Sequence, residues 1–317
     1  MGKKLRKTIF GLCSLTALVH GYNQLVFKYS TRKELLDKNN GKYLKTKHGK
    51  VFYTVKGEGE PILLIHDISC ASSGMEWSKI ENKLALNNKV YIIDLLGCGR
   101  SDKPEITYTS YLYLQIIEQF INEVIGSKTN IAATGKAASI VTLMAEKYEE
   151  LVDKIIIISP EYIKKYSIEK YEIKEQIMKY VINTPVLGTF VYNMSVSRNM
   201  LEEQFEDEYF SKKSRIQNNL VSAYYESAHL GGASARFLYS SLYYNYLYCN
   251  PLCSIGKIDS DKIMIILGKN YSNTEKIMSQ YEECCSEIKI SVLEDTAMLP
   301  QLELAEKVSG IISNFCN

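Results

Sequence analysis

Groups that commonly serve enzymes as a general base are scarce in this chain. Histidine is the side chain that most often accepts a proton at neutral pH. The 317 residues include four histidines, His20, His48, His66 and His229, and none follows position 229. His20 directly follows an apolar N-terminal run, and His48 lies in a predicted hairpin turn. A hydrolytic site that needs an imidazole would therefore use His66 or His229.

The cysteines and acidic residues do not form a metal-binding pattern. Cys249 and Cys253 are four positions apart and Cys284-Cys285 is an adjacent pair, but neither has a histidine at zinc-site spacing. The acidic run at 202–208 lacks the ordered oxygen spacing of a calcium loop and is typical of a solvated helix face. We expect no metal. We also expect free thiols, although disulfides stay open if the domain is exported.

No glycine-rich loop indicates a cofactor. The chain has no Gly-x-x-x-x-Gly-Lys-Ser/Thr loop, and no Gly-x-Gly-x-x-Gly opens a helix after a strand. Its 38 basic and 36 acidic residues leave a formal net charge of +2. Because such a balance offers no basic excess to gather phosphates, a dedicated nucleic-acid binder is disfavoured. We expect neither a cofactor nor a nucleic-acid partner.

Short apolar strands that alternate with helices organise the chain from residue 42 onwards. This alternation is typical of a parallel sheet with helices on both faces. The predicted strands are Lys42–Thr46, Lys50–Val55, Pro61–Ile65, Lys89–Ile93, Asn130–Ala133, Lys154–Ile158, Lys262–Leu267 and Glu287–Leu293. The predicted helices among them are Trp77–Leu86, Tyr108–Ile125, Lys136–Tyr148, Thr274–Cys284 and Leu302–Phe315.

The alternation stops between about Pro160 and Ile255, where the sequence is mainly helical in pattern. We therefore expect one α/β core in two parts, residues 29–159 and 257–317, with an inserted helical cap at 160–256. The cap is rich in tyrosine, with 13 of the 24 tyrosines of the chain. Tyrosine suits surfaces that are apolar at one end and wet at the other, so the cap could meet a partner or a membrane interface.

Three motifs make the chain resemble a known family. The strand Pro61–Asp67 (PILLIHD) precedes Asp94–Pro104 (DLLGCGRSDKP), and Leu299–Glu303 reads LPQLE. This order of motifs resembles the α/β-hydrolase superfamily, specifically its haloalkane dehalogenase and epoxide hydrolase branch with helical caps. The resemblance implies the α/β-hydrolase fold, a mostly parallel twisted sheet, and hydrolysis of esters, epoxides or carbon–halogen bonds.

The catalytic positions implied by the resemblance hold unreactive residues. The family carries its nucleophile on a sharp strand-to-helix turn between small residues. Ala133 and Ala137 fit the small positions, but the nucleophile position is Gly135. The acid position corresponds to Tyr271 and the histidine position to Met298, whose thioether cannot act as a base. The resemblance therefore implies a hydrolase fold that has lost its catalytic triad.

Five residues are candidates for the pocket that remains: His66, Asp67, Lys136, Glu161 and His229. His66 and Asp67 stand where the family has its His-Gly oxyanion loop, in which the histidine is usually structural. Asp67 and Lys136 both depart from the family pattern with opposite charges. We expect them to form an ion pair across the old active site, unless they are two unrelated solvated charges. Glu161 follows a strand, and His229 lies in the cap.

The N-terminus begins with four basic residues, Lys3, Lys4, Arg6 and Lys7, before the apolar run 8–19. This order is typical of a signal peptide or signal anchor. We expect residues 1–28 to be an uncleaved membrane anchor that leaves the domain outside the cytoplasm. A cleaved signal peptide and an amphipathic helix packed on the domain are the alternatives.

Three hypotheses about function follow. The first is a membrane-tethered pseudo-hydrolase that binds a small apolar ligand in the old pocket or a protein partner through the cap. The second is an ester or epoxide hydrolase with a rebuilt site that uses His66 or His229. The third is a scaffold whose pocket has collapsed. A ligand site should keep roughly 300 Å³ of enclosed space, which separates the first hypothesis from the third.

Overall fold

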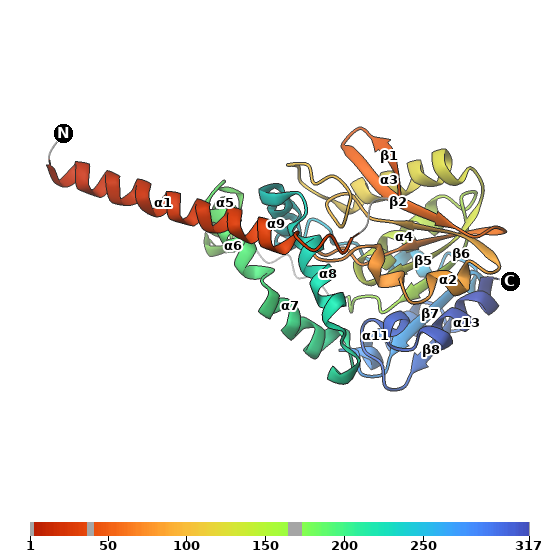
Figure 1. The fold of residues 1–317 in the computed structure, drawn as a ribbon. Helices are drawn as coiled ribbons and strands as arrows, with labels where there is room; N and C mark the ends of the chain where they lie inside the picture. The colour runs from red at the N-terminus through yellow and green to blue at the C-terminus, as the bar shows by residue number, and fades with distance from the viewer. Residues whose placement is uncertain (1–2, 37–40, 164–172, 317) are drawn as a thin grey trace.

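The computed structural model describes residues 3–36, 41–163 and 173–316, and a single sheet runs through it (Figure 1). The sheet has eight strands in the order β1-β2-β4-β3-β5-β6-β7-β8. The strands are β1 (Lys42–Thr46), β2 (Gly49–Lys56), β3 (Glu60–Ile65), β4 (Asn88–Ile93), β5 (Thr129–Thr134), β6 (Val152–Ile158), β7 (Ile263–Gly268) and β8 (Lys289–Leu293). Each predicted strand is confirmed to within two residues at either end.

Pairing in the sheet is parallel except at one edge. β1 pairs antiparallel with β2, and β2 pairs antiparallel with β4. The remaining neighbours, from β4 through β3, β5, β6 and β7 to β8, are parallel. The parallel strands therefore end at one common edge, where loops and side chains from different parts of the chain meet.

Alternate residues of the central strands enter two separate apolar cores. Leu63 and Ile65 of β3 join one core, while Ile62 and Leu64 join the other. This alternation follows from the two-residue repeat of a strand, and burial on both faces explains the continuous apolar runs. The α/β fold class predicted from those runs is confirmed.

Helices cover both faces of the sheet. On one side lie η1 (Gly74–Trp77), α2 (Glu81–Leu84) and α13 (Ala305–Cys316), whose Trp77 and Ile312 belong to the smaller core. On the other lie α3 (Ser110–Phe120), the π-helical turn η2 (Ile121–Ile125), α4 (Gly135–Lys147) and α11 (Thr274–Cys284). The short helix α12 (Pro300–Glu303) precedes α13.

The segment between β6 and β7 is helical. It contains α5 (Ile173–Asn183), α6 (Leu187–Ser195), α7 (Arg198–Gln204), η3 (Phe205–Tyr209), η4 (Lys213–Arg215), α8 (Asn218–His229), η5 (Gly232–Ala235), α9 (Arg236–Tyr243), α10 (Leu252–Ile255) and η6 (Ser260–Lys262). Most of these helices stand together beside the sheet (Figure 1). Buried Tyr192, Phe205 and Tyr224 join the same core as Leu63, so the cap is packed onto the sheet rather than loosely attached.

The N-terminal helix α1 (Lys3–Ser30) projects from the body of the molecule (Figure 1). Its last turns pack on α6 and α8. There the buried Asn23 amide donates to the carbonyl of Val186 (3.0 Å), and Asn193 donates to the side-chain oxygen of Asn23 (3.0 Å). Residues 4–18 are exposed on every side. In the part of the chain that the structure describes, no helix combines the length and apolarity needed to cross a bilayer.

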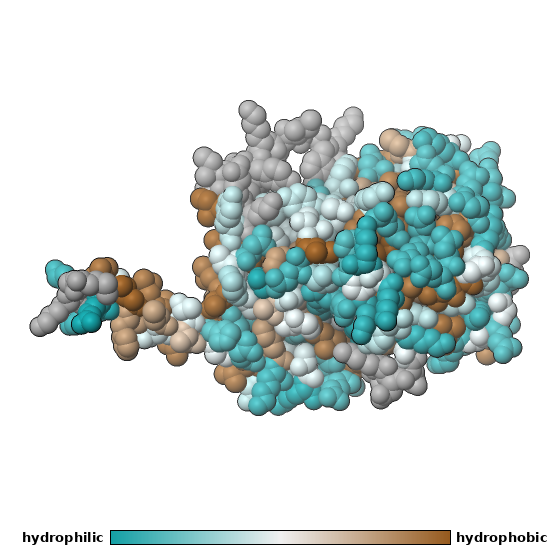
Figure 2. Space-filling view, turned by 90° about the horizontal axis from the view of Figure 1, so that it is seen from above, coloured by the Kyte–Doolittle hydropathy of each residue, from teal (hydrophilic) through white to brown (hydrophobic). Residues whose placement is uncertain are grey.

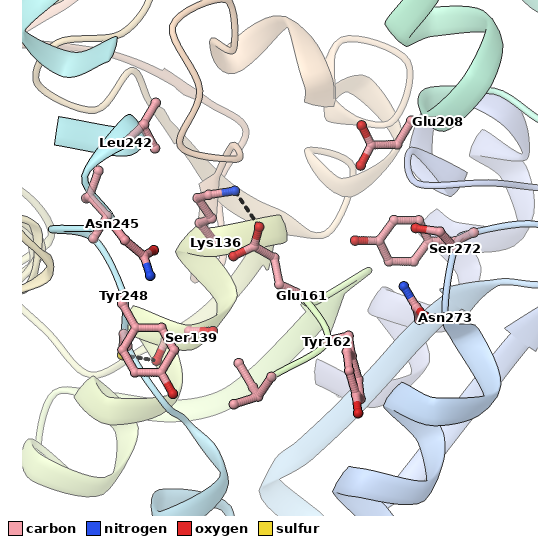
Figure 3. A pocket seen from close by; sticks show the side chains of 14 residues that line it. Lys136, Ser139, Glu161, Tyr162, Glu208, Leu242, Asn245, Tyr248, Ser272 and Asn273 are labelled. Carbon is pink, nitrogen blue, oxygen red and sulfur yellow. Dashed lines mark hydrogen bonds and ion pairs between the residues drawn. The ribbon is translucent and has the colours of Figure 1, made fainter. Parts of the chain in front are cut away.

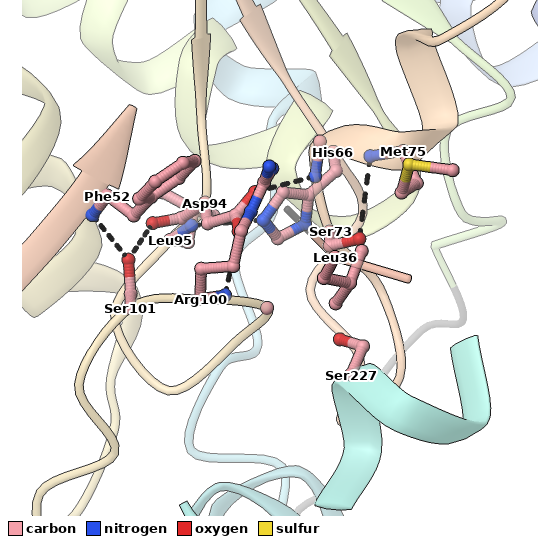
Figure 4. Close-up of polar contacts among 12 residues, drawn as sticks. Leu36, Phe52, His66, Ser73, Met75, Asp94, Leu95, Arg100, Ser101 and Ser227 are labelled. Carbon is pink, nitrogen blue, oxygen red and sulfur yellow. Dashed lines mark hydrogen bonds and ion pairs between the residues drawn. The ribbon is translucent and has the colours of Figure 1, made fainter. Parts of the chain in front are cut away.

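A buried charge pair fixes the loop after β4 (Figure 4). The carboxylate of Asp94 accepts hydrogen bonds from the backbone N–H of Gly74 (2.7 Å), from the backbone N–H of Arg100 (2.7 Å) and from the Arg100 guanidinium (2.7 and 2.9 Å). Burial alone would raise the pKa of Asp94, but the charge and hydrogen bonds of Arg100 outweigh it and hold that pKa below its usual value. One carboxylate thus joins two loops at the strand ends.

Removing the Asp94 carboxylate tests this joint. We expect Asp94→Ala to lower the free energy of unfolding by about 3–5 kcal/mol, because it removes a fully buried carboxylate from its ion pair with the largely buried guanidinium of Arg100. The matched control is Asp153→Ala, which breaks the solvent-exposed Lys128–Asp153 pair (3.4 Å) and should cost less than about 1 kcal/mol. Urea denaturation measures both losses, and losses of equal size would contradict the role given to Asp94.

Candidate functional site

A sharp turn joins β5 to α4 at the common edge of the parallel strands. β5 ends at Thr134 and α4 begins at Gly135, whose φ is +54°. Glycine adopts this left-handed conformation without the steric cost that a Cβ brings. A Cβ at position 135 would also overlap the carboxylate of Asp67. Both the backbone and the neighbouring side chain therefore require glycine here.

The carboxylate of Asp67 lies at the first turn of α4. Asp67 follows β3 and is almost fully buried. Its Oδ1 accepts a hydrogen bond from the backbone N–H of Lys136 (2.7 Å). Burial is the main cause that raises the pKa of Asp67, while the Lys136 charge and the N–H groups of Lys136 and Ile68 act in the opposite direction. The start of a helix is a favourable place for such a negative group.

The Lys136 side chain does not pair with Asp67 in the way the sequence predicts. Its ammonium group contacts the carboxylate of Glu161, whereas Asp67 meets the backbone of Lys136. Burial alone would lower the pKa of Lys136, but the negative charges of Asp67 and Glu161 outweigh burial and raise it. The direct ion pair is thus Lys136–Glu161, because Asp67 is turned toward the backbone N–H groups. Asp67 still acts on the ammonium through its charge.

A cavity of about 280 Å³ opens beside this ion pair (Figure 3). It lies where β5, β6 and β7 end, and the cap segment 242–249 forms one wall. Its lining comprises Lys136, Ser139, Glu161, Tyr162, Ile163, Glu208, Leu242, Asn245, Leu247, Tyr248, Cys249, Tyr271, Ser272 and Asn273. Most of these side chains carry a polar group, so the cavity presents hydrogen-bonding groups rather than a continuous apolar wall.

Of the five residues predicted for the pocket, Lys136 and Glu161 line the cavity. His66 is fully buried away from it. The backbone N–H of Leu95 donates to His66 Nε2 (3.0 Å), so Nδ1 carries the proton and donates to the carbonyl of Asp67 (2.6 Å). Burial lowers the pKa of His66. Both ring nitrogens are thus used within the fold, which fits a structural histidine.

His229 ends α8 and packs beneath α1, apart from the residues that line the cavity. Its Nδ1 contacts the carbonyl of Tyr225 (2.7 Å), and the rings of Phe27, Tyr192 and Tyr225 surround it. Burial lowers the pKa of His229 to about 4. This histidine is therefore neutral near pH 7 and belongs to the contact between the cap and α1.

Tyr271 and Met298 occupy the two other positions at which the family resemblance implies catalytic groups. Tyr271 is 8% exposed and lines the cavity. Met298 is 5% exposed, and its backbone N–H donates to the carbonyl of Glu208 (3.2 Å). A phenol and a thioether stand at these two positions.

Sequence reasoning missed two carboxylates near the site. Glu76 is buried, and its Oε2 accepts from the backbone N–H of Asp67 (3.0 Å) and the hydroxyl of Thr134 (2.7 Å). Burial and the charge of Asp67 raise the pKa of Glu76 to about 7. Glu208, expected on a solvated helix face, lines the cavity instead. No local pattern in the sequence distinguishes either glutamate from its exposed neighbours.

No group of three or more histidine, cysteine, aspartate or glutamate side chains could hold a metal ion within the described ranges. All eight cysteines lie in those ranges and are free thiols.

Comparison with known proteins places this geometry in a family. The model of a family described as alpha/beta hydrolase fold matches residues 60–270. A hydrolase of Metapseudomonas resinovorans that acts on 2-hydroxy-6-oxo-6-(2'-aminophenyl)hexa-2,4-dienoic acid is 27% identical over 107 residues, 33% of this chain and 37% of that protein. An uncharacterised protein of Mycobacterium tuberculosis is 30% identical over 122 residues, 38% of this chain and 35% of its own length. The chain thus matches little more than a third of the length of these relatives.

Solved structures extend the likeness of the fold. A serine hydrolase involved in carbazole degradation superposes with a TM-score of 0.70 at 14% identity, over 87% of this chain and 98% of the other. An epoxide hydrolase gives 0.69 at 15% identity, over 87% and 97%. A protein described as a membrane phospholipase A gives 0.67 at 15% identity, over 100% and 98%. At these identities the superpositions establish the shared fold.

The buried Glu76 predicts a measurable pH dependence of stability. The folded state holds the Glu76 proton more tightly than the unfolded chain, because its pKa is about 7 instead of the usual 4.5. This stabilisation is complete below about pH 4.5 and is lost as the pH rises through 7. We expect the free energy of unfolding to fall between pH 5 and pH 8 by about 2–3 kcal/mol more in the wild type than in Glu76→Gln.

The Glu76→Gln variant is a close control, since an amide oxygen can still accept from Asp67 and Thr134 but the side chain does not titrate. Urea denaturation at several pH values gives the two curves. Parallel curves for the two proteins would show that Glu76 titrates normally.

Proposed function

Because the chain belongs to the α/β-hydrolase fold family, we propose that it is a member that binds a ligand without covalent catalysis and attaches to a membrane through α1. The observation that carries the proposal is the carboxylate of Asp67 at the turn between β5 and α4. In this family that turn holds the nucleophile, and the N–H of the residue after it stabilises the oxyanion. Here the corresponding residues are Gly135 and Lys136.

The turn between β5 and α4, which the Asp67 carboxylate occupies, argues against acyl transfer in two ways. Gly135 has no side chain to attack a carbonyl, and the overlap with Asp67 leaves no room for one. The backbone N–H of Lys136 already donates to the Asp67 carboxylate at 2.7 Å. A developing oxyanion would have to displace this buried negative group or lie beside it, and both raise the barrier rather than lower it.

The remaining positions of the triad support the same conclusion. Burial and the charges of Glu161, Glu208 and Asp67 raise the pKa of Tyr271, so its phenol stays protonated near neutral pH. The thioether of Met298 accepts no proton in this range. His66 and His229 are engaged elsewhere in the fold and do not line the cavity. We infer that the cavity itself, at about 280 Å³, is kept for a small ligand.

The polar lining favours a ligand with polar groups. Asn245, Ser272 and Asn273 add hydrogen-bonding groups beside the Lys136–Glu161 pair. This lining suits a polar small molecule better than the apolar ligand that the sequence suggested. An apolar ligand would cover these polar groups without offering them hydrogen bonds, and burying unpaired polar groups costs binding free energy.

The rival is a hydrolase with a rebuilt site, which the activities of the relatives favour, and an esterase assay separates the two. We expect purified wild-type protein to hydrolyse p-nitrophenyl butyrate no faster than buffer, since nucleophile, base and oxyanion site are all missing. His66→Gln and His229→Gln are assayed beside it, with circular dichroism to check their folds. Turnover that copurifies with the wild type and disappears in either folded variant would overturn the proposal.

The proposed membrane attachment rests on the exposed part of α1. Its apolar side chains Phe10, Leu12, Leu15 and Leu18 are 59–75% exposed. The N-terminal end of the chain stands out from the body of the protein and carries hydrophobic side chains (Figure 2). An isolated helical stretch of this length is marginal in water, so it needs an apolar environment to persist. Residues 1–33 contain seven basic and no acidic residues, a charge that fits an anionic bilayer surface. The membrane phospholipase A superposes over the full chain, α1 included.

Vesicle flotation tests the attachment. We expect the wild type to float with vesicles of phosphatidylcholine and phosphatidylglycerol. The variant Phe10→Asp/Leu15→Asp should partition at least about tenfold more weakly, because it removes two large apolar side chains from the bilayer contact. The control is Leu86→Asp, which changes a leucine 79% exposed on the α/β core. Equal flotation of all three proteins would refute attachment through α1.

A further inference from the structure

The charges around the cavity indicate what kind of ligand it takes. Resting on the proposed ligand-binding function, we propose that the cavity binds a small organic amine in its protonated form. Two glutamates line the cavity, Glu161 and Glu208, against one cation, Lys136 (Figure 3). The buried Asp67 lies directly behind, at the backbone of Lys136. The described lining is therefore acidic on balance.

Lys136 is already committed to Glu161. The two side chains are in direct contact, about a third and somewhat under half exposed (33% and 44%), so the pair stands at the wall of the cavity. Glu161, Glu208 and Asp67 all act to raise the pKa of Lys136, which keeps it charged. An anionic ligand would have to compete with Glu161 for this ammonium while facing Glu208, so an anion is disfavoured on electrostatic grounds.

Glu208 is the second carboxylate that lines the cavity, beside the Glu161 that contacts Lys136. Among the described residues, no basic side chain lies within ion-pair distance of it, and its carboxylate accepts one long hydrogen bond, 3.4 Å, from the amide of Gln204. Its own backbone is fixed, because the carbonyl of Glu208 accepts the N–H of Met298 (3.2 Å). The carboxylate is thus held at the cavity with capacity to accept further N–H groups.

Tyr271 provides a second, independent observation. Its side chain is more than nine-tenths buried, lines the cavity, and no described residue hydrogen-bonds its hydroxyl. After burial, the largest influences on that hydroxyl are the charges of Glu161 and Glu208, which places it in the field of both carboxylates. A protonated amine can donate to the phenol oxygen and to Glu208, and its charge is attracted to the ring face.

A matched set of four-carbon probes tests the charge of the ligand. Butylamine, butanol and butyrate share one chain and differ in a cationic, neutral or anionic end. Isothermal titration calorimetry of the full-length protein at pH 7.5 measures each affinity. We expect butylamine to bind at least about fivefold more tightly than butanol, and butyrate more weakly than both.

Two glutamate variants locate the effect. Glu208→Gln should weaken butylamine about fivefold or more and leave butanol unchanged, because it removes one negative charge and keeps the shape. The control is Glu206→Gln in the same turn, η3, where the carboxylate pairs with exposed Lys213 away from the cavity. Thermal denaturation of both variants confirms that they fold, and the selectivity for the amine within each variant does not depend on how much folded protein is present.

The outcomes separate this inference from the function it rests on. Tighter butylamine binding that Glu208→Gln alone abolishes supports an amine site. Tighter binding of butyrate or butanol, or an equal loss in Glu206→Gln, overturns the amine site and leaves a ligand-binding cavity in place. Ester turnover by the wild type would instead overturn the non-catalytic function, whatever the cavity prefers.

Discussion

The hydrogen bond between the backbone N–H of Lys136 and the carboxylate of Asp67 is the constraint on which the site depends. It brings the loop after β3 against the first turn of α4 and closes the turn at which a hydrolase of this fold would carry its nucleophile. The contact also explains why position 135 is a glycine, because any Cβ there would overlap that carboxylate. The environment of Glu76 depends on Asp67 as well. A side-chain oxygen of Glu76 accepts the backbone N–H of Asp67, and the charge of Asp67 helps to raise the pKa of Glu76.

Contacts in the surrounding fold hold this arrangement in place. The strands β3 and β5 lie next to each other in the parallel sheet, so the loops that follow them meet by topology. The Asp94–Arg100 pair holds the next loop, and Nε2 of His66 accepts the N–H of Leu95, which joins the end of β3 to the end of β4. Each of these contacts is buried, where an unpaired partner is costly. The site is therefore acidic and bordered by buried polar contacts, which fits the proposed binding of a charged ligand.

The cap and α1 form one connected assembly above this edge. His229, surrounded by aromatic rings, and Asn23, bonded to Val186 and Asn193, join the base of α1 to the cap. The cap in turn supplies Glu208 and Asn245 to the cavity. The proposed membrane attachment through α1 would therefore reach the cavity through these contacts with the cap.

The sequence by itself determined the α/β class, the eight strands and the glycine, tyrosine and methionine at positions 135, 271 and 298, since apolar periodicity and residue identity are local properties. It also named Lys136 and Glu161 as candidates for the pocket, and both line the cavity. Only the tertiary structure decided that Lys136 pairs with Glu161 rather than Asp67, that Glu76 is buried and that Glu208 faces the cavity. Lys136 lies 25 residues from Glu161 and 69 residues from Asp67 along the chain. Which charges meet depends on how the cap packs over the strand ends, and no local pattern encodes that packing.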